Sequence, residues 1–118
     1  MKSTEQLELF LQDCEARKEI LFRKANDYSN EADVLSNFKL TAQVAMTTPQ
    51  QFAMNMIALK TVRLGNLIGS GKSPMNESVI NSIEDLENYA FLLKCIINEE
   101  KRMEATKVAE RVANETIT

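Results

Sequence analysis

Glycine and proline are scarce in this chain, with three glycines and two prolines among 118 residues. Strands are usually joined by turns that are rich in these two residues, so their scarcity favours long helices. An apolar fraction of 44% is high enough to form a packed core and excludes a chain that is mainly disordered. We therefore predict an all-α fold, a small bundle of four to five helices that oligomerisation completes.

Apolar periodicity and capping residues divide the chain into four helical segments. We predict helices from Ser3 or Thr4 to about Lys24, from about Val34 to Met46, from Pro49 to about Ile68 and from about Asn76 to Asn114. The third helix has the clearest start, because Thr caps helices and Pro is tolerated at the first helical position. The charged stretch from Glu99 onward predicts one domain over 1–98 and a helical extension over 99–118.

Several kinds of chemistry are excluded by composition. The chain has no histidine, which excludes Cys/His zinc sites and imidazole-based catalysis. Cys14 and Cys95 lie in apolar patterns, and we expect them to be core residues. A net charge of −3 provides no basic surplus for a nucleic-acid backbone. No stretch resembles a signal peptide or a membrane span, so we expect a cytoplasmic protein without membrane or nucleic-acid partners.

The predicted third helix is apolar nearly all round and yet carries two cations. Lys60 and Arg63 lie one turn apart within a stripe formed by Phe52, Met56, Leu59 and Leu67. Buried cations require acidic partners or an anionic ligand. The alternative is that both side chains reach solvent along their apolar stems.

The predicted last helix has a core stripe and a polar line on another side. The core stripe is expected to contain Val79, Ile83, Leu86, Ala90, Leu93 and Ile97. Glu77, Asn81, Asp85 and Asn88 follow one another at spacings of four, four and three residues. A polar line is often only a solvated face, but this one continues into Leu92 and Ile96, which indicates that the helix is packed on two sides.

Two arrangements link these helices. Glu77 and Asp85 neutralise Lys60 and Arg63 directly in one, which is a structural ion-pair network. In the other, the carboxylates hold Mg²⁺ while the cations hold phosphate oxygens, which is a phosphohydrolase site. The spacing of the residues does not separate the two.

Several short motifs resemble those of a known family. They are Lys24-Ala25-Asn26-Asp27-Tyr28, Asn37-Phe38, Lys60-Thr61-Val62-Arg63-Leu64, Asn76-Glu77-Ser78-Val79 and Asp85-Leu86-Glu87-Asn88-Tyr89. Together they resemble a phage and bacterial nucleotide-modification-associated domain, over about residues 20–93. In helical layout that family is similar to the all-α nucleotide pyrophosphatases of the MazG kind. Asn81-Ser82 departs from the family's Asp-Thr and removes one carboxylate from the polar line.

The resemblance implies a Mg²⁺-dependent nucleoside triphosphate pyrophosphatase of phage nucleotide metabolism, working in the cytoplasm of a bacterial host. Glu77 and Asp85 match the acids that would be catalytic and hold the metal. Lys60 and Arg63 match the basic pair, with Asn81 and Asn88 beside the ligand. Asp27, Tyr28 and Asn37 match the first motif and are expected to contribute to ligand binding.

Two other functions are compatible with the same residues. One is a binder without turnover, which would sequester a nucleotide or inhibit a host protein in an anti-defence role. The other is a structural oligomer whose ion pairs define the register of its helices. Helices that are apolar on two sides predict a homo-oligomer, a dimer or tetramer, in every case.

Overall fold

The computed structural model describes residues 1–27, 34–71 and 77–117. Within these ranges all regular structure is helical, which confirms the all-α prediction. The helices are α1 (Ser3–Asp27), α2 (Ser36–Val44), α3 (Pro49–Gly69) and α4 (Glu77–Ile117). The chain divides into two compact units, Met1–Asn37 and Phe38–Thr118.

The unit Met1–Asn37 contains α1, which begins at Ser3, as capping predicted, and ends three residues beyond the predicted end at Lys24. Its large apolar side chains remain exposed; they include Leu7, Phe10, Leu11, Leu21 and Phe22. Cys14 is also exposed, so the prediction that it is a core residue is wrong for the single chain. The apolar side chains along α1 are not buried within the unit Met1–Asn37, because a single helix cannot bury one of its own faces.

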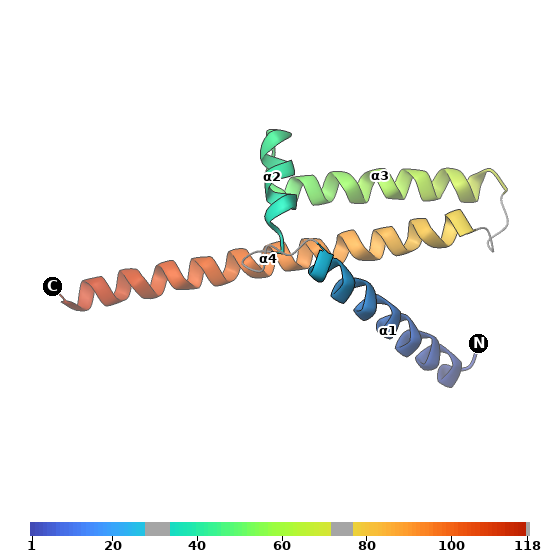
Figure 1. The fold of residues 1–118 in the computed structure, drawn as a ribbon, viewed down its shortest axis with the longest axis horizontal. Coiled ribbons are helices and arrows are strands. Elements are labelled where there is room, and N and C mark those ends of the chain that lie inside the picture. The colour runs from blue at the N-terminus through green and yellow to red at the C-terminus, as the bar shows by residue number, and fades with distance from the viewer. Residues whose placement is uncertain (28–33, 72–76, 118) are drawn as a thin grey trace. The chain divides into compact units, whose positions relative to one another are not determined.

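The second unit is built on a hairpin of α3 and the N-terminal half of α4, which run side by side in Figure 1. Lys60 pairs with Asp85, and Gln50 donates a hydrogen bond to Glu100, so residue numbers rise on one helix as they fall on the other. The two helices are therefore antiparallel. The C-terminal part of α4 extends past the N-terminal end of α3 (Figure 1), and residues 101–116 are exposed throughout.

The start of α3 follows from its sequence. Thr48 has an extended backbone, and its hydroxyl accepts a hydrogen bond from the backbone N–H of Gln51 at 3.1 Å. Pro49 occupies the first helical turn, where no backbone donor is needed. This is the capping arrangement that Thr47-Thr48-Pro49 predicted, because an Ncap hydroxyl satisfies a donor that the helix itself leaves without a partner.

The end of α2 is less conventional. Met46 has a φ of 55°, the left-handed conformation that usually falls to glycine. The N–H of Met46 donates to the carbonyl of Gln43, and that of Thr47 donates to the carbonyl of Ala42, both at 3.0 Å. These are the two hydrogen bonds of a Schellman cap. Met46 therefore has a strained backbone conformation, which the sequence did not predict.

The contact between α3 and α4 follows a seven-residue repeat on both helices. On α4 one line of buried or partly buried positions contains Val79, Ser82, Leu86, Tyr89, Leu93 and Ile96, and other partly buried residues lie beside it. On α3 the corresponding line contains Ala53, Ile57, Lys60, Leu64 and Leu67, with Phe52 and Met56 among the partly buried residues beside it. Steps of three and four residues along both helices are the packing pattern of a coiled coil. The core of the hairpin is this single seam.

Half of the predicted core stripe of α4 is exposed rather than buried. Ile83 is 38% exposed, Ile97 is 36% exposed and Ala90 is exposed, whereas Val79 is buried and Leu86 and Leu93 are partly buried, as predicted for core residues. On α3, Leu59 and Val62 are about 60% exposed, so this helix is not buried on most sides. Both helices have apolar side chains on two sides, and the sequence pattern did not reveal which side each presents to the other.

Candidate functional site

The Lys60 ammonium and the Asp85 carboxylate join α3 to α4. Lys60 Nζ lies 3.1 Å from Asp85 Oδ2, and the two side chains are 21% and 45% exposed. Lys60 occupies a seam position, where its aliphatic stem packs and its charged end needs a partner. Asp85 provides that partner from the edge of the seam. Asp85 thus lies on the side of α4 that meets α3, whereas Ile83 and Ile97 lie on another side and are exposed.

Arg63 lies one turn after Lys60 on α3 but outside the seam, and it is exposed. It lines a shallow hollow with Leu59, Val62, Asn66 and Leu67, all of which also belong to α3. The hollow thus has an apolar floor with a guanidinium and an amide at its edge. Asn66 and the apolar floor were not predicted as site residues, although Leu59 and Asn66 follow Phe52 at steps of seven residues.

Helix α2 shows which flanks of α3 and α4 lie on the same side of the hairpin. The rings of Phe38 and Phe52 meet edge to face, with centroids 5.0 Å apart. Lys39 pairs with Glu99 of α4. Because α2 contacts both, Phe52 and Glu99 lie on one side, which we name the α2 side.

Seven residues make about two helical turns, so residues seven positions apart lie on nearly the same side of a helix. Steps of seven therefore show which residues continue the α2 side along α3 and α4. They lead from Phe52 to Leu59 and Asn66, and from Glu99 to Leu92 and Asp85. Arg63, the hollow and Asp85 therefore share the α2 side, beyond the part that α2 covers. In Figure 1, α2 stands at the N-terminal end of α3, well before its C-terminal turns.

The two asparagines of the predicted polar line lie one turn before and one turn after Asp85. Asn81 is exposed and Asn88 is partly buried. Ser82, where the resembling family has threonine, is 3% exposed, and its hydroxyl donates to the carbonyl of Ser78 at 2.8 Å. Ser82 is thus occupied inside its own helix, while Asn81, Asp85 and Asn88 supply amide and carboxylate groups along the α2 side.

The predicted magnesium site is only partly described. Glu77 begins α4, but its side chain lies outside the described residues. Among the residues that the structure describes, no three acids or cysteines gather closely enough to hold a metal ion. Asp85 is engaged by Lys60. The described side chains do not by themselves fit Mg²⁺.

The first predicted motif cannot be joined to this site. Tyr28 lies outside the described residues, as does the side chain of Asp27 at the end of α1. Asn37 is exposed in the first turns of α2 and belongs to the unit Met1–Asn37. The candidate site therefore consists of Lys60, Arg63, Asn81, Asp85 and Asn88, all from the hairpin.

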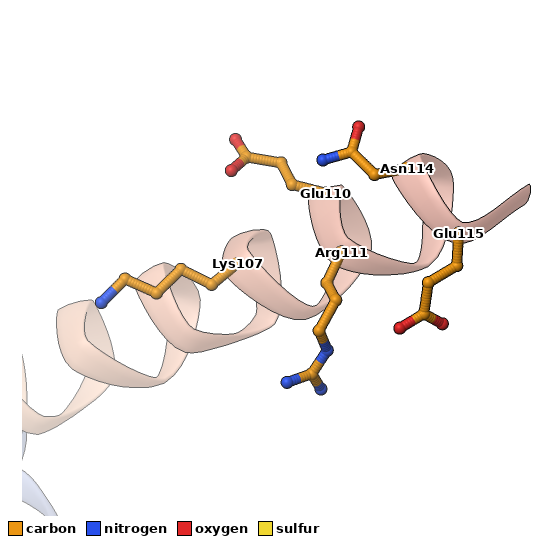
Figure 2. A pocket seen from close by; sticks show the side chains of 5 residues that line it. All are labelled: Lys107, Glu110, Arg111, Asn114 and Glu115. Atoms are coloured by element: carbon orange, nitrogen blue, oxygen red, sulfur yellow. The ribbon is translucent and has the colours of Figure 1, made fainter. Parts of the chain in front are cut away.

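A second hollow lies at the far end of α4. Its lining residues are Lys107, Glu110, Arg111, Asn114 and Glu115, all from one helix. Figure 2 shows their side chains spreading in different directions rather than converging on a common point. Side chains that do not converge cannot surround a ligand, so this region is a charged helix surface.

Comparison with protein-family models, with curated proteins and with solved structures finds no match. Among the described residues, no helix combines the length and the apolar character needed to cross a membrane. The geometry of the hairpin is therefore the basis for any functional conclusion.

Proposed function

We propose that the α2 side of the hairpin binds a nucleotide, with Arg63 and Lys60 on its phosphates. The observation that carries this proposal is the 3.1 Å contact between Lys60 and Asp85. It joins the basic motif of α3 to the acidic motif of α4, the two that resemble the nucleotide-modification-associated family. A phosphate oxygen that replaces Asp85 beside Lys60 would find a second cation, Arg63, one turn away.

The chemistry around the pair suits a nucleotide. Guanidinium groups bind phosphate through two parallel hydrogen bonds, and Arg63 is exposed and available to do so. The apolar floor of the hollow, formed by Leu59, Val62 and Leu67, offers a surface for the flat face of a base. Asn66 and Asn88 provide amides for the hydrogen-bonding edge of the base or sugar.

The finer proposal is that the protein is a Mg²⁺-dependent nucleoside triphosphate pyrophosphatase of a phage, acting in the host cytoplasm. Catalysis would require Glu77 and Asp85 together on the metal. Its alternative is a binder that sequesters the nucleotide without cleaving it. Asn81 in place of an acid supports the binder, because it leaves fewer carboxylates for a metal.

Calorimetry with a panel of nucleoside triphosphates, with and without Mg²⁺, tests the binding proposal. We expect Arg63→Ala to weaken binding about tenfold or more, because a charge-assisted hydrogen bond contributes roughly 1.5–3 kcal/mol. Arg102→Ala is the matched control, since Arg102 is an exposed arginine of α4. Absence of binding across the panel, or equal losses in both variants, would refute the proposal.

Pyrophosphate release separates the enzyme from the binder. Release that requires Mg²⁺ and is lost in both Glu77→Gln and Asp85→Asn supports the pyrophosphatase. Binding without release, unchanged by chelation of divalent metals, supports sequestration.

A second candidate function is structural or protein-binding. It is favoured by the many large apolar side chains that the chain leaves exposed, among them Met54, Leu59, Val62, Phe91 and Ile97. Such a protein would bind a host protein or another copy of itself, and Lys60 and Asp85 would only define helix register. In that case no nucleotide raises the melting temperature, whereas a bound ligand raises it by mass action.

A further inference from the structure

The flank of the hairpin opposite the α2 side has no partner within the hairpin. A displacement of two residues rotates about 200° around a helix. Residues two positions from Phe52, Leu59 and Asn66 are therefore on the other flank of α3: Met54, Thr61 and Ile68. The same step from Asp85, Leu92 and Glu99 leads to Ile83, Ala90 and Ile97 of α4. We name these six residues the rear face.

The rear face is apolar and open. Met54 is 47% exposed and Ile68 is 59% exposed on α3, while Ile83 and Ile97 are 38% and 36% exposed on α4. The six side chains themselves are uncharged, whereas Glu87, Lys94 and Lys101 alternate with Ile83, Ala90 and Ile97 along α4 at steps of four and three residues. Small residues lie beside them: Ala58 is exposed, and a side chain at Gly65 would meet nothing within 4 Å. Another helix can therefore approach the backbone closely.

The size of the rear face suits a protein partner. Helix α3 has 21 residues, so it is about 30 Å long, and two adjacent helices are about 20 Å wide. The resulting footprint of roughly 600 Å² approaches the ~800 Å² that each partner buries in a standard interface.

The charges along α4 identify the partner. Beside the rear face, the acidic residue Glu84 precedes Ala90 in the sequence, and the basic residues Lys94 and Lys101 follow it. All three side chains are exposed. A second α4 in antiparallel orientation, with a two-fold axis near Ala90, brings Glu84 of each copy alongside Lys94 and Lys101 of the other. A parallel copy would bring lysines against lysines. Self-complementary charge is the signature of an isologous interface.

We propose that a second copy of this chain packs antiparallel on the rear face, so that two hairpins form a four-helix bundle. The α2 side of each hairpin then faces outward, and both proposed nucleotide sites remain accessible. The proposal is independent of nucleotide binding, because it rests on the flank that the nucleotide does not use.

Disulfide trapping tests which face meets the partner. In a Cys14→Ser/Cys95→Ser chain without nucleotide, Ala90→Cys lies close to its own copy across the two-fold axis and should form a covalent dimer on mild oxidation. Asn66→Cys, on the α2 side, is the matched control and should not. Equal crosslinking of both variants, or of neither, would overturn the proposal.

A charge exchange tests the orientation. Sedimentation of the full chain should show a dimer that Lys94→Glu weakens about tenfold or more, because both symmetric contacts become repulsive. Combining Glu84→Lys with Lys94→Glu and Lys101→Glu should restore the dimer. A wild-type monomer at tens of micromolar refutes the proposal. So does an intrachain disulfide between Ala90→Cys and a retained Cys14, which would identify α1 as the occupant.

Discussion

The ammonium nitrogen of Lys60 in α3 lies 3.1 Å from a carboxylate oxygen of Asp85 in α4, and Lys60 occupies a seam position that a coiled coil normally gives to an apolar side chain. The lysine is the more buried partner, with 21% of its side chain exposed against 45% for Asp85. The two residues therefore depend on each other unequally, because removal of the carboxylate leaves a mostly buried cation.

This asymmetry predicts the outcome of a double-mutant cycle. Asp85→Asn should destabilise the chain by roughly 1–2 kcal/mol, since Lys60 loses its charged partner inside the seam. Lys60→Met should cost less, about 0.5–1 kcal/mol, because Asp85 retains contact with water. Urea denaturation of the single and double variants measures the coupling. A coupling energy near zero would mean that the pair does not define the register of the hairpin.

Met46→Gly should stabilise the protein by about 1 kcal/mol. The φ of 55° at Met46 is strained for a residue with a side chain and free for glycine. The methionine side chain is 92% exposed, so little packing is lost. Thermal unfolding measures the gain, and Met46→Ala is the control because alanine retains the strain. An equal shift in both variants would show that the side chain, not the backbone, is responsible.

Thr48→Ala should destabilise the chain by about 1 kcal/mol, because the N–H of Gln51 loses the hydroxyl that caps α3. Thr48→Ser retains the hydroxyl and should remain close to the wild type. Chemical denaturation compares the two. If serine fails to restore stability, the methyl group rather than the cap accounts for the loss.

Truncation defines where the domain ends. Glu99 pairs with Lys39, and Glu100 accepts a hydrogen bond from Gln50, whereas residues 101–116 are exposed throughout. A chain that ends at Met103 should therefore have the same melting temperature as the monomeric full-length chain. A chain that ends at Asn98 should lose roughly 1 kcal/mol with these polar contacts. Comparable melting temperatures for both truncations would support the predicted boundary at residue 98 instead.

The local features of the fold were predictable from the sequence. Scarce glycine and proline, the Thr48-Pro49 start and the Gly69 end of α3 depend on residues within a few positions of one another. Capping and backbone preference act over that range, so helix type and limits can be deduced without tertiary information. The sequence also predicted that Lys60 and Arg63 interact with Glu77 and Asp85, directly or through a metal and a phosphate, but it did not determine that Lys60 pairs with Asp85.

The orientation of the helices was decided by the tertiary structure. Both the Ile83–Ala90–Ile97 line and the Ser82–Tyr89–Ile96 line of α4 repeat every seven residues, and periodicity alone does not rank them. Burial in the folded chain distinguishes them: Ser82 and Ile96 are each 3% exposed, whereas Ile83 and Ile97 are 38% and 36% exposed. The sequence by itself determined that the chain is helical and where α3 begins and ends. Only packing between helices determined which face of α3 contacts which face of α4, because each face packs against residues that are distant in the sequence.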